Sequence, residues 1–421
     1  MKNRAVREHL RRRAASRTGR LLVLTGARQT GKTTLVREAF PDFPCLSVED
    51  PLVRPAFSGL SAADWIERYP RAVIDEVQKA PSIIESIKAA YDADRQVRYV
   101  LLGSSQILLL SRVRESLAGR VALEELWPLT LPEIATSAWS EAVADSRLIA
   151  WLRAPRRRGA LLGVPAASRA YSRAAADLER YLRFGGLPLV HDPELDDDER
   201  ERWLRDYQRT YLERDVADLA TLRDLEPFVV AERIIAGRSG KLINWSDLAR
   251  SASISPPTAR RFMRYLELSY QVLLLPPFSR NQEKRLAKMA KAHFVDPGVL
   301  RSLLNRRGDP SGEEFESAVV AELYKQIRNA DLRAELHHLR THDGREVDLL
   351  VELEGGFVAF EIKQSERVSD RDGRHLRGLE ALLDKPLLGA FVLSQDRQVR
   401  ELAGGILALP VAWALGAPGE G

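Results

Sequence analysis

Residues 26–34 (GARQTGKTT) have the types and the spacing that bind phosphate groups. Two glycines, a lysine and a threonine fit the pattern G-x-x-x-x-G-K-[ST] of a P-loop. Glycines let backbone N–H groups curve around phosphate oxygens, and the N-terminus of a following helix adds partial positive charge. Lys32 would reach the β- and γ-phosphates of ATP, and the hydroxyl of Thr33 would bind Mg²⁺. We expect nucleotide contacts from the whole loop, which comprises Gly26, Ala27, Arg28, Gln29, Thr30, Gly31, Lys32, Thr33 and Thr34.

An acidic pair, Asp75 and Glu76, follows the apolar run at residues 71–74. This order is typical of a Walker B element. Asp75 would hold Mg²⁺, usually through water, and Glu76 would polarise the attacking water. Two acids after a short strand would, on their own, be interpreted as a solvated loop. Their position downstream of a phosphate-binding loop favours a site that hydrolyses ATP.

Two further positions could act on the γ-phosphate. The strand-like residues 97–102 end in a small polar group, where either Ser104 or Ser105 could sense the phosphate. Arg120 follows a glycine and is a candidate to donate positive charge to the transition state, from the same subunit or from a neighbour. An ordinary surface arginine is an equal alternative.

A second constellation lies in the segment 344–365 (GREVDLLVELEGGFVAFEIKQS). Its Gly-Gly pair at 355–356 predicts the two-residue turn of a β-hairpin. A turn there would pair Asp348 with Lys363 and would put Glu361 diagonal to Asp348 on the same face. The other face of the hairpin would be wholly apolar.

Two carboxylates beside a lysine have the chemistry that phosphodiester cleavage needs. Asp348 and Glu361 would hold Mg²⁺, and Lys363 would orient or deprotonate water and stabilise charge. Glu316, near the start of a helix-like segment, could supply a third acid. The alternative is a cross-strand salt bridge between Asp348 and Lys363 on a water-facing side of a sheet. The D…E-x-K pattern in this hairpin favours a nuclease-like site.

Alternating strands and helices must position the nucleotide-binding residues. The P-loop lies between the apolar run at 21–25 and a helix-like segment at 35–40, which is the context that the motif requires. Further strands are expected at 71–74 and 97–102. This alternation predicts a parallel, doubly wound sheet with the nucleotide at the carboxyl ends of the strands.

The 421 residues exceed one ordinary core, so we expect an α/β protein of several domains. The expected parts are a basic helix at 1–20, a P-loop domain at 21–135, a helical subdomain with a basic loop at 136–240, a winged-helix domain at 241–305, a nuclease-like α/β domain at 306–415, and a tail at 416–421.

The winged-helix prediction depends on residues 241–280, where two capped helices are followed by an apolar strand. Ser246 would cap the first helix, and Ser255 would cap the second. Arg260, Arg261 and Arg264 lie on that helix, where groups that contact bases or phosphates would lie. The alternative is a module for packing or protein contact, with these arginines facing water.

Composition limits location and partners. The net charge of +5 permits nucleic-acid binding without establishing it, because the charge is spread along the chain. Cys45 is the only cysteine, which fits a reducing compartment. The basic first twenty residues lack the apolar centre of a secretory signal, and no run approaches the roughly 18 apolar residues of a membrane span. We therefore expect a cytoplasmic protein without a membrane partner. An oligomer is expected if Arg120 acts on a neighbouring subunit.

Six motifs together resemble a known family: GARQTGKTT, AVIDEVQKAP, LLGSS, SLAGRV, YLERDV and the EVD…EIK hairpin. The chain is similar to prokaryotic AAA+ ATPases of the archaeal-ATPase type, which carry a C-terminal domain of unknown function with a restriction-endonuclease-like core. The resemblance covers residues 18 to 400 approximately, except for the Arg-rich segment 152–169. It implies nucleotide chemistry at Lys32, Thr33, Asp75, Glu76, Ser104 or Ser105, and Arg120, and an endonuclease-like site at Glu316, Asp348, Glu361 and Lys363.

The expected function is that of an ATPase with ATP and Mg²⁺ as cofactors. Its nucleotide state would be coupled to the winged-helix and nuclease-like domains, which would act on DNA or RNA. The alternative is a nucleotide-dependent signalling switch or a toxin–antitoxin component. In that alternative the C-terminal domain binds protein and cleaves nothing.

Overall fold

The first five strands form one parallel sheet in the computed structural model, which describes residues 1–103, 117, 119–155, 161–162, 168–211, 225–280 and 289–419. The strand order is β2-β3-β4-β1-β5, and every pairing is parallel. The strands are β1 (Leu21–Thr25), β2 (Cys45–Ser47), β3 (Arg71–Asp75), β4 (Arg98–Leu102) and β5 (Ala122–Glu125). The predicted α/β class and parallel sheet are therefore confirmed.

Helices cover both faces of this sheet because both faces are apolar. All five residues of β1 are buried, as is usual for a central strand of a parallel sheet. One face packs against α1 (Arg7–Ala15) and α2 (Lys32–Ala39), and the other packs against α5 (Pro81–Ala93). Three short elements extend the second layer, namely α3 (Arg54–Ser58), α4 (Ala62–Arg68) and the 3-10 turn η1 (Val77–Lys79).

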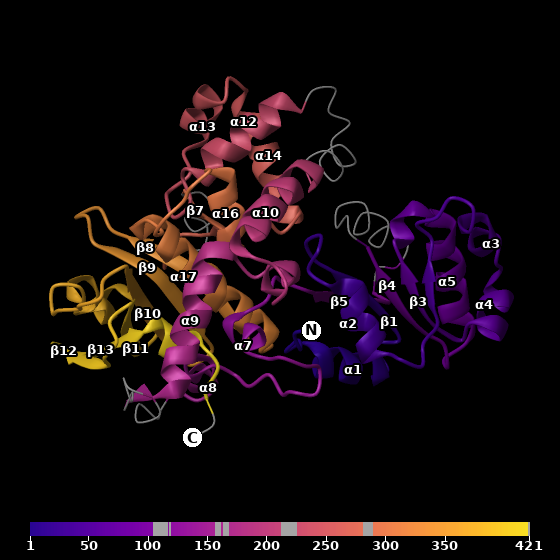
Figure 1. Ribbon diagram of the computed structural model, residues 1–421, viewed down its shortest axis with the longest axis horizontal. Coiled ribbons are helices and arrows are strands. Elements are labelled where there is room, and N and C mark those ends of the chain that lie inside the picture. The colour runs from indigo at the N-terminus through magenta and orange to yellow at the C-terminus, as the bar shows by residue number, and fades with distance from the viewer. Residues whose placement is uncertain are drawn as a thin grey trace.

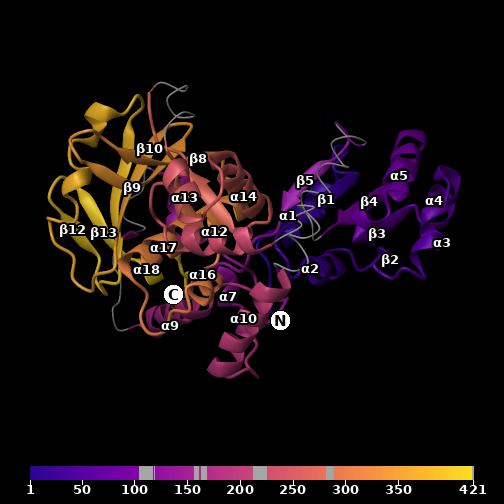
Figure 2. The same ribbon diagram turned by 90° about the horizontal axis from the view of Figure 1, so that it is seen from above.

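A helical segment follows the five-stranded sheet and lies between it and the C-terminal sheet. Helix α9 of this segment is capped by Ser168 and contacts α16 and α18 near the C-terminal sheet. Figures 1 and 2 show the five-stranded sheet at one end, the C-terminal sheet at the other, and α9, α16 and α17 between them. The connecting elements are α7 (Leu131–Ile134), α8 (Arg147–Arg153), α9 (Arg169–Phe184), η3 (Pro188–His191) and α10 (Asp197–Tyr211).

Three helices and a two-stranded ribbon form the next module. The helices α12, α13 and α14 share one apolar core, and strand β6 pairs antiparallel with β7. Ser255 caps α14 as predicted, by accepting a hydrogen bond from the backbone N–H of Thr258. The predicted cap of α13 is wrong, because the side chain of Asn244 caps that helix and accepts from the backbone N–H of Ser246. The bounds are α12 (Glu226–Ala236), α13 (Trp245–Ser251), α14 (Pro256–Leu268), β6 (Val272–Leu275), β7 (Lys291–Phe294) and α16 (Pro297–Leu303).

The C-terminal part is a six-stranded mixed sheet in the order β12-β13-β11-β10-β9-β8. Helix α17 packs its apolar side on one face, and a separate apolar cluster covers the other face. The elements are α17 (Gly312–Asn329), β8 (Ala334–Arg340), β9 (Glu346–Leu353), β10 (Gly356–Lys363), η5 (Arg374–Leu376), η6 (Leu379–Leu382), β11 (Leu387–Ser394), β12 (Arg400–Leu402), β13 (Ile406–Pro410) and α18 (Val411–Leu415).

The β9–β10 hairpin has a different register from the one predicted. Gly356 pairs with Leu353, so the turn consists of residues 354 and 355, and the predicted pairing of Asp348 with Lys363 is wrong. Gly356 serves a close approach instead of the turn, because a Cβ atom there would lie 2.3 Å from the carbonyl oxygen of Pro386. The shift is two residues, so the predicted side-chain faces are unchanged.

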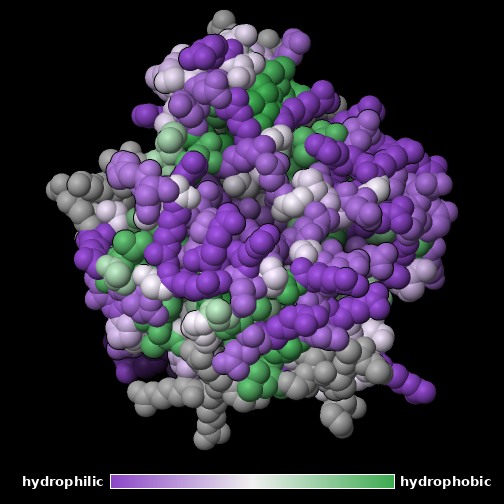
Figure 3. All heavy atoms as spheres, turned by 90° about the vertical axis from the view of Figure 1, so that its left-hand side faces the viewer, coloured by the Kyte–Doolittle hydropathy of each residue, from purple (hydrophilic) through white to green (hydrophobic). Residues whose placement is uncertain are grey.

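The outer surface is largely hydrophilic on the side that Figure 3 shows, where apolar groups are scattered between polar ones. The large apolar side chains of the six-stranded sheet, such as Phe357, Phe360 and Phe391, are buried beneath this surface. Within the described ranges, no helix combines the length and the apolar character that crossing a membrane requires.

Candidate functional site

The P-loop joins β1 to α2 and is shaped by its two glycines. A Cβ atom on Gly26 would lie 2.2 Å from the carbonyl oxygen of Leu126, so only glycine lets the loop pass β5. Gly31 has a φ of +87° and precedes the first residue of α2. The ammonium group of Lys32 donates to the carbonyl oxygens of Gly26 and Ala27, both at 2.8 Å. The ammonium therefore lies within the loop, where phosphate oxygens would replace these carbonyl contacts.

The two residues predicted to hold Mg²⁺ at the nucleotide site lie in direct contact. The Thr33 hydroxyl donates to Oδ2 of Asp75 at 2.9 Å. The other oxygen of Asp75 accepts a hydrogen bond from the backbone N–H of Glu76 at 3.0 Å. Sheet topology explains this contact, because β1 and β3 flank β4 and their carboxyl ends meet at one edge. A hydroxyl and a carboxylate are ligands that suit Mg²⁺.

Glu76 stands at the position expected for the residue that polarises water. Its backbone is left-handed, with a φ of 57°, which is uncommon outside glycine and directs the chain sharply away from β3. The side-chain amide of Gln78 donates to Oε2 of Glu76 at 2.5 Å. The carboxylate of Glu76 is therefore held next to Asp75 by the following turn.

The other two nucleotide-site candidates have different outcomes. Ser104 and its alternative Ser105 lie outside the described residues. Arg120 contacts Asp92 on α5 through two N–O pairs of 2.8 and 3.1 Å. This hydrogen bonding raises the pKa of the Arg120 guanidinium and lowers the pKa of Asp92. In this structure the side chain of Arg120 is thus directed to its own domain's surface, which fits the alternative of a surface arginine.

Arg4 braces the P-loop and was not predicted from the sequence. Arg4 is buried, and its guanidinium donates to the carbonyl oxygens of Thr30 (2.8 Å) and Trp127 and to Oε1 of Glu133 (3.2 Å). These contacts join the N-terminal segment, the loop and the chain after β5. No pattern distinguishes Arg4 from the other arginines of the basic segment, so the sequence carries no signal for this role.

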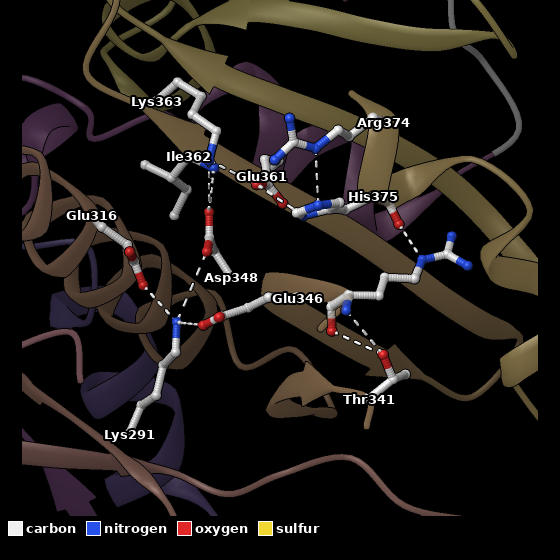
Figure 4. A network of polar contacts seen from close by, with 11 residues as sticks. Lys291, Glu316, Thr341, Glu346, Asp348, Glu361, Ile362, Lys363, Arg374 and His375 are labelled. Carbon is white, nitrogen blue, oxygen red and sulfur yellow. Dashed lines mark hydrogen bonds and ion pairs between the residues drawn. The ribbon is translucent and has the colours of Figure 1, made fainter. Parts of the chain in front are cut away.

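The predicted residues of the C-terminal site also converge. Asp348 lies on β9, Glu361 and Lys363 on β10, and Glu316 on α17. The ammonium group of Lys363 is 2.7 Å from Oε1 of Glu361 and 4.0 Å from Oδ2 of Asp348. The backbone N–H of Ile362 donates to the same oxygen of Asp348 at 2.8 Å. Figure 4 shows these side chains facing one another across the hairpin.

The acids of this site are buried, which contradicts the alternative of a water-facing salt bridge. Asp348 is 7% exposed and Glu361 is 4% exposed. Burial raises the pKa of Glu316, Asp348 and Glu361, and the charge of Asp348 raises the pKa of the other two further. The ammonium groups of Lys291 and Lys363 act in the opposite direction. A cation next to these carboxylates lowers their pKa and favours their ionised forms, as the two ammonium groups do here.

Lys291 belongs to this site and was not predicted from the sequence. It begins β7, outside the nuclease-like segment, and its side chain is 4% exposed. Its ammonium group is 2.7 Å from Oε1 of Glu346, 3.0 Å from Oε1 of Glu316 and 3.8 Å from Oδ1 of Asp348. Figure 4 shows it among these three carboxylates, on the side of Asp348 away from Lys363. Glu346 was missed as well, although it stands two residues before Asp348.

The acids of this site offer oxygen ligands of the kind that a divalent cation takes. Oε2 of Glu361 is buried and has no hydrogen-bond partner among the described residues. Such an atom is costly unless a cation or a donor can reach it. Asp348 shares the ammonium group of Lys291 with Glu316 and that of Lys363 with Glu361, and carboxylate oxygens are the ligands that Mg²⁺ and Mn²⁺ accept.

The three arginines of α14 lie on its exposed side, opposite the buried Phe262 and Met263. Arg260 lies over the ring of Trp245, at 5.7 Å from its centroid, and Arg264 is 3.6 Å from Glu267. Exposed guanidinium groups of this kind suit phosphate contacts and plain solvation equally.

Three family models match successive parts of the chain. An AAA domain matches residues 18–135, a domain of unknown function (DUF8612) matches residues 175–309, and another (DUF4143) matches residues 311–414. The first match agrees with the P-loop and the parallel sheet, and it defines the N-terminal part as an AAA-type P-loop ATPase domain. The predicted AAA domain and the predicted C-terminal domain of unknown function are therefore confirmed, and a second domain of unknown function lies between them.

The chain is 30% identical over 425 residues to uncharacterized protein Rv2008c of Mycobacterium tuberculosis and to uncharacterized protein Mb2031c of Mycobacterium bovis. Each alignment covers 95% of this chain and 83% of the relative. The chain belongs to the family of these mycobacterial proteins. Among solved structures it is similar to the Walker-type ATPase PABY2304 of Pyrococcus abyssi, with 16% identity, a TM-score of 0.45, and coverage of 70% of this chain and 95% of that chain.

Proposed function

We propose that the protein hydrolyses ATP at the P-loop site. The observation that carries this proposal is the contact of 2.9 Å between the Thr33 hydroxyl and Asp75 next to the enclosed ammonium of Lys32. Lys32 binds the β- and γ-phosphates, and Glu76 orients and polarises the attacking water. Thr33 and Asp75 would hold Mg²⁺, which neutralises phosphate charge when bound.

The test is steady-state ATP turnover by the full chain with Mg²⁺. We expect Lys32→Ala to lower the turnover number by at least about 10²-fold, because a charge that stabilises the transferring phosphoryl group is removed. Arg68→Ala on the exposed end of α4 is the control, and its turnover should equal that of the wild type. Undiminished turnover in folded Lys32→Ala would exclude the P-loop as the hydrolytic site.

We further propose that the ATPase domain acts on a nuclease-like C-terminal domain. In this proposal residues 241–305 are a winged-helix domain, and residues 306–415 are a restriction-endonuclease-like domain that holds Mg²⁺ at Glu316, Asp348 and Glu361. Lys363 orients the attacking water, and Arg260, Arg261 and Arg264 contact the nucleic acid. The buried, unpartnered Oε2 of Glu361 within an acidic site supports this proposal.

Cleavage of plasmid DNA and of tRNA tests the nuclease proposal. We expect wild type with ATP and Mn²⁺ or Mg²⁺ to cleave one of them, and Asp348→Ala to cleave neither, because that substitution removes a central metal ligand. The matched control is Asp343→Ala in the exposed turn before β9, which should cleave as wild type does. Wild type that cleaves no substrate with either metal would contradict the nuclease proposal.

The second candidate function is that of a nucleotide-dependent switch whose C-terminal domain binds a protein. The position of Lys291 favours it, because an ammonium group already neutralises the acids that a nuclease would offer to metal. A wild type that hydrolyses ATP and cleaves no nucleic acid would support this candidate.

A further inference from the structure

The C-terminal acid cluster receives a cation from another part of the chain. Glu316, Asp348 and Glu361 belong to α17 and the six-stranded sheet, whereas Lys291 belongs to the β6–β7 ribbon that follows α14. The Nζ atom of Lys291 lies at 2.7 to 3.8 Å from oxygens of Glu346, Glu316 and Asp348. Lys291 therefore forms ion pairs with the acid cluster from an element outside the six-stranded sheet.

The ammonium group and a divalent cation would compete for the same oxygens. Mg²⁺ binds carboxylate oxygens at about 2.0 to 2.1 Å, and such an ion between Glu316 and Asp348 would lie next to the Nζ atom. Two positive charges at that separation repel, and Lys291 is too buried for water to screen them. One cation excludes the other.

A second feature of the ribbon, the buried side chain of His293, lowers the stability of its packed position. His293 lies two residues after Lys291, is fully buried, and neither of its ring nitrogens has a hydrogen-bond partner among the described residues. A buried polar group without a partner destabilises the arrangement that buries it. The ion pairs of Lys291 hold β7 against the sheet, and the unsatisfied ring of His293 opposes them.

We propose that Lys291 is a tethered cation that occupies the divalent-cation site of the C-terminal domain, and that this site takes Mg²⁺ or Mn²⁺ only when β7 withdraws. The proposal builds on the assignment of Glu316, Asp348 and Glu361 as metal ligands. It adds a regulatory element, because the state of β7 decides whether the acids are available.

The test measures Mn²⁺ binding by electron paramagnetic resonance and calorimetry on the full chain without nucleotide. Every variant also carries Thr33→Ala, so that Mn²⁺ binding at the P-loop site is weak and equal in all of them. We expect Lys291→Met to bind one Mn²⁺ at least ten-fold more tightly than the chain with Lys291, and Asp348→Asn to remove this gain. Lys291→Arg keeps the charge, and Lys241→Met breaks an exposed pair with Glu313; both should bind Mn²⁺ as the Lys291 chain does. No gain in folded Lys291→Met would overturn the proposal.

A second measurement uses the chain with Lys291 and decides the case where Lys291→Met does not fold. Acetylation of lysines, followed by mass spectrometry, reports the exposure of Lys291. We expect slow acetylation of Lys291 that accelerates at least five-fold at saturating Mn²⁺, and no acceleration in Asp348→Asn. Fast acetylation without Mn²⁺, or an unchanged rate with Mn²⁺, would overturn the proposal.

The outcomes separate this inference from the nuclease proposal. If Lys291→Met binds Mn²⁺ more tightly but cleaves neither plasmid nor tRNA, the tethered-cation proposal is supported and the nuclease proposal is contradicted. If wild type cleaves in an Asp348-dependent way and Lys291→Met binds Mn²⁺ no more tightly, the nuclease proposal is supported and the tethered-cation proposal is contradicted.

Discussion

Glu232 illustrates how one buried side chain sets a pH dependence. It lies on α12 within the core of the three-helix module, is 2% exposed, and its Oε2 atom has no hydrogen-bond partner among the described residues. Burial raises its pKa from 4.5 to about 8, and the nearby Arg233 offsets only part of that. The folded module therefore keeps Glu232 protonated near neutral pH, whereas the unfolded chain ionises it.

The sign of the effect follows from proton binding. Between pH 4.5 and about 8 the folded state binds more protons than the unfolded state, so the free energy of unfolding of this module falls as the pH rises. We expect Glu232→Gln to remove this fall and to stabilise the module at pH 9 by on the order of 2 to 4 kcal/mol.

Hydrogen exchange of the α12–α14 amides, corrected for intrinsic rates between pH 5 and pH 9, measures this local stability. The exposed Glu67→Gln on α4 is the matched control and should leave the slope unchanged. The same slope in wild type and Glu232→Gln would show that Glu232 is not the group responsible.

At the scale of elements, the sequence predicts what depends on neighbours along the chain. The P-loop and its flanking strand and helix follow from residues 21–40, and the contact of Thr33 with Asp75 follows from parallel strands ending at one edge. The shared face of Asp348, Glu361 and Lys363 follows from the two-residue period of strands, and that period survives the error in register.

Features that depend on packing between distant elements could not be predicted. The register of the hairpin is set by the close approach of Gly356 to Pro386 on the neighbouring chain segment, and a Gly-Gly pair looks the same whether it serves a turn or an approach. Lys291 reaches the acids only because β7 packs against α17. Arg4 braces the P-loop through backbone carbonyls, which leave no trace in side-chain patterns.

At the scale of the whole molecule, one ribbon touches both proposed sites. The hydroxyl of Tyr270, just before β6, is 2.6 Å from the hydroxyl of Thr25, which precedes the P-loop. The ring of Tyr270 packs edge-to-face on Trp127, with 4.9 Å between centroids. At the other end of the ribbon Leu275 pairs with Lys291, which enters the acid cluster. Coupling of the two sites through this ribbon requires that the ribbon respond to nucleotide.

We expect Mg²⁺ with a slowly hydrolysed ATP analogue to raise the acetylation rate of Lys291 about five-fold, which corresponds to about 1 kcal/mol of coupling. Tyr270→Phe should bring this ratio close to one, because it removes the hydroxyl contact with Thr25 and keeps the ring against Trp127. Tyr324→Phe is the matched control, since Tyr324 packs on the same tryptophan from α17.

Both tyrosine variants must bind the analogue with the affinity of wild type for the comparison to report coupling instead of occupancy. If Tyr270→Phe keeps the five-fold response, the signal does not pass through the hydroxyl contact. If wild type shows no response at saturating analogue, Lys291 does not report the nucleotide state and the two sites work independently. A response lost in Tyr270→Phe and kept in Tyr324→Phe would make the β6–β7 ribbon the physical link by which the ATPase domain opens the C-terminal site.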